Sequence, residues 1–96
     1  MIVNRRTYTA KPGHMEALIE VLKAGGSYLE NMPTFRVYQA LFGESSRAVL
    51  ELDFDDLAHY ESFWARWGAA PESAQVLERF RQQVEAGETN EIWRLC

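Results

Sequence analysis

Residues 34–54 constrain the fold most strongly, because two runs of alternating apolar and polar residues flank a short turn. The first run, residues 34–42, carries on one face Phe35, Val37 and Leu41. The second run, residues 47–54, follows the turn Gly43-Glu44-Ser45-Ser46 and carries on one face Ala48, Leu50, Leu52 and Phe54. Successive side chains of a strand point to opposite faces, so this pattern predicts an antiparallel hairpin with one face against a core.

The segment before the hairpin predicts a strand followed by a helix. Residues 2–10 are rich in strand-forming side chains and end at the turn residues Lys11-Pro12-Gly13. From His14 the apolar spacing becomes helical, with a stripe made of Met15, Leu18, Ile19 and Leu22. The stripe extends to Leu29 if the helix passes Gly25-Gly26, where two glycines favour a break, and Pro33 ends it.

The segment after the hairpin predicts two helices and a last strand. Asp55-Asp56 can cap a helix that runs to about Trp67, and Pro71 opens a second helix that Gly87 ends. Residues 88–96 then form the final strand. The resulting β-α-β-β-α-(α)-β order is that of an α+β, ferredoxin-like fold with a four-stranded antiparallel sheet and helices on one side. With 96 residues, the chain is expected to form one domain over 1–96.

Charge and composition exclude several classes of protein. Ten Lys and Arg face 14 Asp and Glu, so the net charge is −4, which disfavours nucleic acid and anionic membranes as partners. RNA-recognition modules share this element order, but here the outer face of the third strand carries Val49, Glu51 and Asp53 instead of aromatic rings. The only cysteine, Cys96, and two histidines make no metal constellation. Without a membrane-spanning or signal-like apolar run, we expect a cytoplasmic protein.

The sheet face turned away from the helices carries more apolar surface than a solvated face needs. Its predicted apolar residues are Tyr8, Tyr38, Phe42, Val49, Trp93 and Leu95. Charges of both signs lie between them, at Arg36, Arg47, Glu51, Asp53 and Glu91. Such a patch is either a sticky surface or, as we prefer, a face that packs on a second copy with charges paired across the interface. The residues predicted at this homodimer interface are Arg36, Tyr38, Phe42, Val49, Glu51 and Trp93.

The opening of the chain resembles a known family. Arg6-Thr7-Tyr8-Thr9-Ala10-Lys11-Pro12-Gly13, followed at once by an amphipathic helix, resembles the start of NIPSNAP-type domains. The element order and the apolar second sheet face resemble the wider dimeric α+β barrel superfamily, which includes antibiotic-biosynthesis-type monooxygenases. The chain departs from the family at Asn4, where an acidic residue is usual, and at Leu52 and Phe54, where Trp and Tyr are usual. The resemblance implies a dimer with a pocket between sheet and helices, and it leaves the reaction open.

Aromatic residues of the helix after the hairpin are the main candidates for that pocket. Its predicted buried stripe is Leu57, Tyr60, Trp64 and Trp67, which with Tyr8 and Asn4 gives as pocket candidates Asn4, Tyr8, Tyr60, Trp64 and Trp67. At helical spacing, however, a packed core is the preferred interpretation of these rings. Gly25-Gly26 favours a cavity, because side chains are missing where the first helix faces the sheet. For Asn4 and its neighbour Arg6, cross-strand pairing at the dimer seam is the preferred interpretation.

Three functions stay open on the sequence. The leading prediction is a small homodimeric NIPSNAP-like protein of unassigned role that binds a small apolar or aromatic ligand, with no cofactor and no metal. The alternative is a cofactor-independent monooxygenase of a phenolic substrate, for which the resemblance implies polar pocket residues such as Asn4, Tyr60 and Trp64. A third is an association module without a ligand. Helical phase places His59 on the solvated side, and neither it nor His14 suits the haem ligand of the haem-degrading relatives, so no catalytic residue is assigned.

Overall fold

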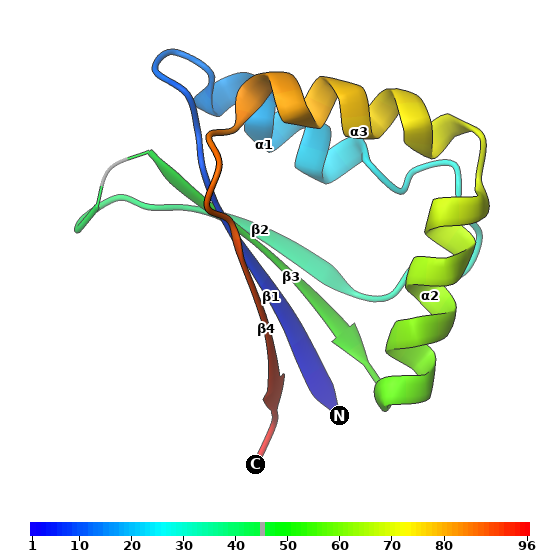
Figure 1. Cartoon of the computed structure of the whole chain (residues 1–96). Helices are drawn as coiled ribbons and strands as arrows, with labels where there is room; N and C mark the ends of the chain where they lie inside the picture. The colour runs from blue at the N-terminus through cyan, green and yellow to red at the C-terminus, as the bar shows by residue number, and fades with distance from the viewer. Residues whose placement is uncertain (45) are drawn as a thin grey trace.

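The computed structural model describes residues 1–44 and 46–96 and has the predicted element order. The elements are β1 (Ile2–Thr9), α1 (Met15–Ala24), β2 (Phe35–Gln39), β3 (Arg47–Phe54), α2 (Leu57–Ala69), α3 (Glu72–Gln83) and β4 (Thr89–Arg94). The four strands form one antiparallel sheet in the order β2-β3-β1-β4. All three helices lie on one side of it, with α1 and α3 side by side and α2 beyond the end of β3 (Figure 1). This confirms the ferredoxin-like α+β fold.

The register of β1 against β3 decides which side chains face the helices. Tyr8 pairs with Ala48, and Asn4 pairs with Leu52, so both β1 residues lie on the helix-covered face. Both are buried, with exposed fractions of 6% and 0%. The prediction that Tyr8 lies on the second sheet face was therefore wrong. Which of the alternating side chains of the first strand face the helices can be decided only once its pairing with a neighbouring strand is known.

Helix α1 ends where the glycines begin. Its last residue is Ala24, and the two residues that follow form a turn instead of a further helical turn. The unfavourable helix propensity of two consecutive glycines accounts for this end. Leu29 nevertheless packs against the core from the segment that leads to Pro33. The core itself lies between the sheet and the helices and is centred on Leu18, Phe54 and Phe63.

Helix α2 starts as predicted but buries a different residue. Oδ1 of Asp56 accepts a hydrogen bond from the backbone N–H of His59 at 2.8 Å and so caps the helix. The residue at the centre of its buried face is Phe63, 1% exposed, whereas Leu57 is 57% exposed. The predicted stripe began one turn too early, since Leu57 in the first turn of α2 is exposed while Phe63 packs on Phe54 at the end of β3.

The second strand is shorter than predicted. It ends at Gln39, so Leu41 and Phe42 belong to the loop before β3, with exposed fractions of 86% and 95%. The expectation that Leu41 faces the helices was wrong, and Phe42 lies beyond the sheet face on which it was placed. The apolar run Ala40-Leu41-Phe42 resembles a continuation of the strand in the sequence, because it contains no turn residue that would mark the end. In the part of the chain that the structure describes, no helix has the length and hydrophobicity to cross a membrane.

Candidate functional site

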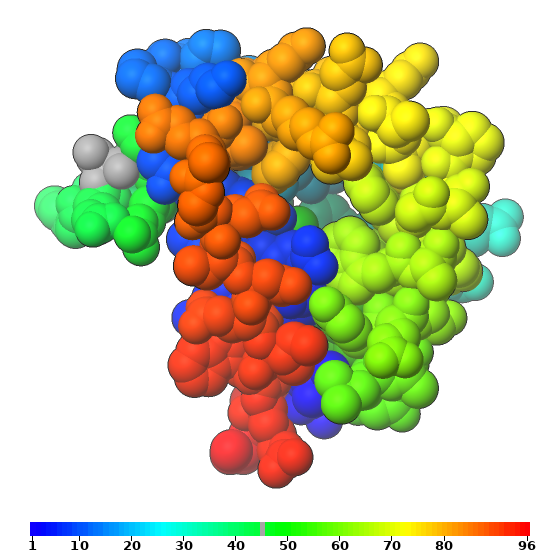
Figure 2. Space-filling model, in the orientation of Figure 1, coloured from blue at the N-terminus to red at the C-terminus, as the bar shows by residue number. Residues whose placement is uncertain are grey.

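A cavity of about 160 Å³ lies between the sheet and the helices. All three helices, strands β1 to β3 and the residues around Gly25 contribute to its wall, which is mostly apolar. The lining residues are Arg6, Tyr8, Val21, Leu22, Gly25, Gly26, Met32, Phe35, Leu50, Leu52, Phe63, Trp64, Trp67, Val76, Leu77, Phe80 and Glu88. Figure 2 shows the molecule hollowed between the side chains of β1 (blue) and those of α2 and α3 (green to yellow). No helix covers β4 on that side.

The hollow exists because glycine ends α1 and tryptophans of α2 form the opposite wall. Gly25 and Gly26 both line the cavity, as their place on the inner side of the first helix suggested. A side chain at Gly26 would meet Met32, whose Cε lies 2.6 Å from the position that a Cβ would occupy. Trp67 is fixed in this wall, since its Nε1 donates a 2.8 Å hydrogen bond to the carbonyl oxygen of Gly25.

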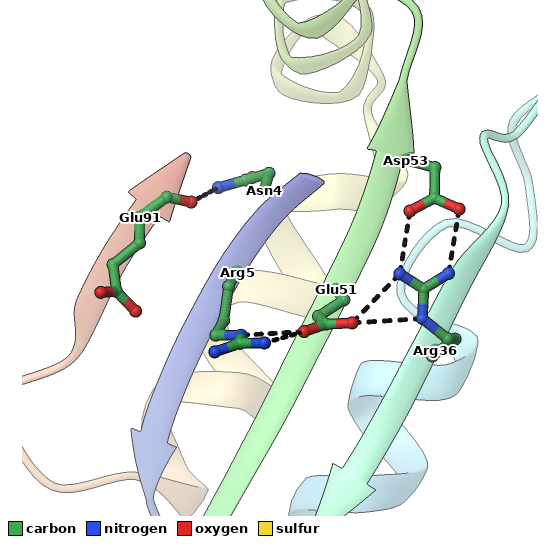
Figure 3. Close-up of polar contacts among 6 residues, drawn as sticks. All are labelled: Asn4, Arg5, Arg36, Glu51, Asp53 and Glu91. Atoms are coloured by element: carbon green, nitrogen blue, oxygen red, sulfur yellow. Dashed lines mark hydrogen bonds and ion pairs between the residues drawn. The ribbon is translucent and has the colours of Figure 1, made fainter. Parts of the chain in front are cut away.

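Arg6 places a positive charge in this apolar wall. Its Cζ lies 4.0 Å from the centroid of the Trp64 ring, a cation–π contact. Its Nε donates to Oδ1 of Asn4 at 3.1 Å, while the Asn4 amide nitrogen donates to Oδ1 of Asn90 at 2.6 Å and to the carbonyl oxygen of Glu91 at 3.0 Å. Figure 3 shows this last bond from β1 to β4. Asn4 therefore holds Arg6 in place from behind the cavity.

Tyr8 presents a neutral hydroxyl to the cavity. Burial raises the pKa of its phenol to about 12, although the nearby Arg6 guanidinium acts in the opposite direction, and the carboxylate of Glu88 raises it further. The ring packs edge-on against Phe80, with 4.8 Å between the centroids. At neutral pH the Tyr8 hydroxyl can both donate and accept a hydrogen bond.

One polar atom of a cavity-lining residue has no hydrogen-bond partner. The Nε1 of Trp64 is buried, and within residues 1–44 and 46–96 nothing accepts a hydrogen bond from it. Leaving a buried donor without a hydrogen bond costs about 1–3 kcal/mol, so such an atom is rare in a well-packed protein core. The ring itself packs on Phe63 at 5.0 Å and on Trp67 at 5.8 Å between centroids.

Three of the five predicted pocket residues line the cavity, and two do not. Tyr8, Trp64 and Trp67 contribute to the wall. Tyr60 instead packs on Phe54, with ring centroids 5.6 Å apart, and Asn4 is fully buried behind Arg6. The convergence of Asn4, Tyr60 and Trp64 that the monooxygenase alternative needed is therefore not found in the structure.

Sequence reasoning missed the two charged residues of the cavity, Arg6 and Glu88. The sequence did indicate a shared face for Arg6 and Tyr8, because side chains two residues apart in a strand point to the same side. For Arg6, however, we preferred a position at the dimer seam. The histidines do not line the cavity: Nδ1 of His14 is 2.6 Å from Oε1 of Gln83, and His59 packs edge-on against Phe54, with 5.1 Å between the ring centroids. Among the described residues, no group of three His, Cys, Asp or Glu side chains is placed to hold a metal ion.

The second sheet face carries an ion-pair network. The Arg36 guanidinium donates to both Asp53 oxygens, at 2.8 and 2.9 Å, and to Oε1 of Glu51, while Arg5 binds Oε2 of Glu51 at 2.7 Å (Figure 3). These charges, which were expected to pair across a dimer interface, already have partners within the chain. Neighbouring antiparallel strands bring them together within one chain, because Arg5 and Arg36 both pair in register with Glu51.

The ion pairs shift the pKa values of the residues that form them. Burial opposes ionisation of Glu51, but the hydrogen bonds from Arg5 and Arg36 lower the pKa of its carboxyl below the ordinary value. The hydrogen bonds from Arg36 likewise lower the pKa of Asp53. The same bonds to Asp53 and Glu51 raise the pKa of Arg36. The three groups are thus charged together, and the face they occupy is electrostatically balanced without help from another molecule.

Apolar side chains surround this network on the same face. Val49 is half-buried beside it, with the half-exposed ring of Tyr38 directly opposite on β2. Trp93, 52% exposed, lies on β4 in register with Val3, and the Arg5 guanidinium lies 5.7 Å from the centroid of its ring. Tyr38, Val49, Trp93 and the charged network therefore form one continuous surface, which we call the open sheet face.

Solved structures of other proteins share this architecture over the whole chain. An uncharacterized NIPSNAP domain protein from Burkholderia xenovorans is 18% identical, with a TM-score of 0.86, 100% of this chain and 95% of that chain being covered. A protein from Agrobacterium tumefaciens is 23% identical, with a TM-score of 0.81 and coverage of 100% and 94%. A putative antibiotic biosynthesis monooxygenase from Deinococcus radiodurans is 14% identical, with a TM-score of 0.73 and coverage of 100% and 93%. At these identities the likeness establishes the fold alone.

The family assignment rests on the sequence. No curated protein is similar enough to match the chain. The family model of NIPSNAP, in contrast, matches residues 3–95, which is nearly the entire length. This span includes the opening motif before α1, the hairpin and the last strand. The chain is a member of the NIPSNAP family.

Proposed function

We propose that this protein binds a small apolar or aromatic molecule in the cavity between its sheet and its helices. The observation that carries the proposal is the cavity itself, about 160 Å³ in volume and walled mainly by apolar and aromatic side chains. An apolar cavity of about 150 Å³ is enough to hold benzene. The ligand is thus expected to have a body of about one aromatic ring, held between Trp64, Phe80 and the apolar residues of the sheet.

Intrinsic tryptophan fluorescence tests this proposal, because Trp64 and Trp67 both line the cavity. Toluene is expected to change the emission in a saturable way. Val76→Phe, which fills the cavity from α3, should abolish the change, whereas Ala74→Phe on the exposed side of the same helix should leave it intact. A signal that does not saturate, or that Val76→Phe leaves unchanged, would contradict binding in this cavity.

We also propose that residues 1–96 form one domain that assembles as a homodimer through the open sheet face. The charges there are already paired within the chain, so a second copy can cover them without leaving a buried charge unpartnered. The apolar residues around them remain available, and the loop residue Phe42, 95% exposed, extends the apolar surface beyond the sheet. A standard interface needs about 800 Å² from each partner, roughly one eighth of the 6423 Å² surface of the chain.

Sedimentation equilibrium at micromolar concentration tests the dimer. The unmodified chain is expected at twice its mass of 11.1 kDa. Val49→Lys should shift the equilibrium to the monomer, because the new ammonium group would be buried at the interface without a partner. Ala74→Lys adds the same charge on an exposed helix position and should remain dimeric. An unmodified chain that sediments at 11.1 kDa would refute the dimer.

The second candidate is the cofactor-independent oxygenation of a phenol. The observation in its favour is Arg6, whose positive charge in the cavity wall would stabilise a bound phenolate. One oxygen atom of O2 would enter the ring as a quinone oxygen and the other would leave as water. An oxygen electrode separates the candidates: an oxygenase consumes one O2 for each quinone formed from a phenol, and a binding protein consumes none.

A reducing compartment fits the chemistry of the chain, and we propose the cytoplasm. The one cysteine, Cys96, is exposed and free. Free thiols of this kind persist where glutathione and thioredoxin keep them reduced. Fractionation of cells that produce the protein tests this location.

A further inference from the structure

We infer that the natural ligand of the cavity is an apolar acid, with a body of about one aromatic ring and one anionic group directed at Arg6 and Trp64. This inference rests on the proposed binding function and specifies the chemical class of the ligand. It comes from the polar atoms of the cavity wall, which the volume and the apolar lining alone do not explain.

The first of these atoms belong to Arg6. A guanidinium has five N–H donors. In Arg6 the Nε donor is used in the bond to Asn4, and the guanidinium also lies within hydrogen-bond reach of the Tyr8 hydroxyl, but it forms no ion pair with a carboxylate among the residues that the structure describes. Arg5 and Arg36 of the same sheet differ from Arg6, since both are paired with carboxylates. A half-buried cation whose free donors lie in a cavity wall is suited to bind a carboxylate.

The second donor is the indole nitrogen of Trp64. Because Cζ of Arg6 lies 4.0 Å from the centroid of the Trp64 ring, the guanidinium and this orphaned N–H belong to one part of the wall. Nε1 itself is not exposed to the cavity, so an anionic oxygen bound by Arg6 accepts from both groups once the Trp64 ring turns slightly. Binding such a ligand would supply the partner that the buried Nε1 lacks, whereas a hydrocarbon would leave it unsatisfied.

The remaining polar groups of the wall do not favour a cation instead. Tyr8 is neutral, because burial raises its pKa to about 12. Glu88 is the single carboxylate that lines the cavity in the described part of the chain, and it is exposed to solvent, which screens its charge. The half-buried charge of Arg6 therefore dominates, and Glu88 is expected to weaken anion binding modestly.

Titrations with three probes of one shape test the charge preference. Benzoate, toluene and benzylamine share the ring and differ in carrying a negative, no or a positive charge. We expect benzoate to bind about tenfold to a hundredfold more tightly than toluene, as charged hydrogen bonds contribute on this scale. Benzylamine should bind more weakly than both. Binding is followed by the indole N–H resonance of Trp64 in nitrogen–proton NMR spectra, assigned with Trp64→Phe, and benzoate should move that resonance downfield.

A matched pair of variants assigns the preference to Arg6. Arg6→Met keeps an unbranched side chain against Trp64 and should lower benzoate affinity about tenfold or more while changing toluene affinity less than twofold. Arg79→Met removes the same charge from an exposed position of α3 and should change neither. Glu88→Gln should strengthen benzoate binding by a few fold.

The outcomes separate this inference from the proposed function. If toluene and benzoate bind equally well, or if Arg6→Met weakens both alike, the cavity binds apolar ligands but the anionic class is wrong. If neither probe binds, the proposed function fails, and the inference fails with it. Benzoate binding that Arg6→Met weakens, with toluene binding retained and the Trp64 resonance moved downfield by benzoate but not by toluene, is the expected result.

Discussion

Replacing Phe63 by alanine should destabilise the protein more than any other single truncation in α2. The side chain is 1% exposed and packs against Phe54 and Trp64, with ring centroids 5.7 and 5.0 Å apart. Burial of this kind predicts a loss of about 3–5 kcal/mol in the free energy of unfolding for Phe to Ala. Against a total of about 5–15 kcal/mol, the urea midpoint should fall by about 2 M.

Leu57→Ala is the matched control, since Leu57 lies in the same helix and belonged to the stripe predicted from the sequence. It is 57% exposed, so its truncation should cost less than about 0.5 kcal/mol. Urea unfolding followed by circular dichroism measures both variants. If Phe63→Ala fails to fold, Phe63→Leu should still unfold cooperatively with a loss of about 1–1.5 kcal/mol. A cost at Leu57 equal to or above that at Phe63 would refute the helical phase described above.

Three further substitutions test contacts elsewhere. Arg36→Met should lower the free energy of unfolding by about 1–2 kcal/mol at pH 7 and should flatten the acid limb of the plot of stability against pH. The reason is that the lowered pKa of Asp53 contributes stability above pH 4, which is lost as the pH falls through the pKa of the folded state. Urea midpoints between pH 2 and 7 measure this, and an unchanged acid limb would contradict the network. Ser73→Ala removes a buried hydroxyl that donates to a carbonyl of α2 at 2.5 Å and should cost about 1–3 kcal/mol in thermal unfolding. His59→Ala should cost about 1 kcal/mol, since its ring packs edge-on against Phe54 at 5.1 Å, and no loss would show that contact to be unimportant.

Periodicity along the chain determined the elements of this protein. The hairpin was predictable because Ala48, Leu50, Leu52 and Phe54 alternate without interruption, and all four are buried on the helix side. The cap at Asp56 was predictable for a similar reason, since a carboxylate before an apolar helical stripe satisfies free N–H groups of the first turn. Such features depend on residues a few positions apart, and the chain itself keeps those residues together.

The tertiary structure decided which side chains of these elements face and contact one another. The parity of β1 was settled only by its register with β3, which turned Tyr8 and Arg6 toward the helices. The pairing of Arg36 with Asp53 and Glu51 within one chain follows from the order of the strands, whereas their alternation fits pairing within or between chains equally well. Contacts of this kind join residues that are distant in sequence, so local periodicity has no information about them.

The cavity shows the same division most clearly. Its rings and glycines, Trp64, Trp67 and Gly25-Gly26, were visible in the sequence as candidates, but a packed core predicts the same residues at the same spacing. Whether they enclose a space depends on how far α2 and α3 stand from the sheet, and the sum of all side-chain contacts between the layers sets that distance. A charge such as Arg6 enters the wall only after strand pairing has chosen its face, because its side chain is equally compatible with either side of an isolated strand.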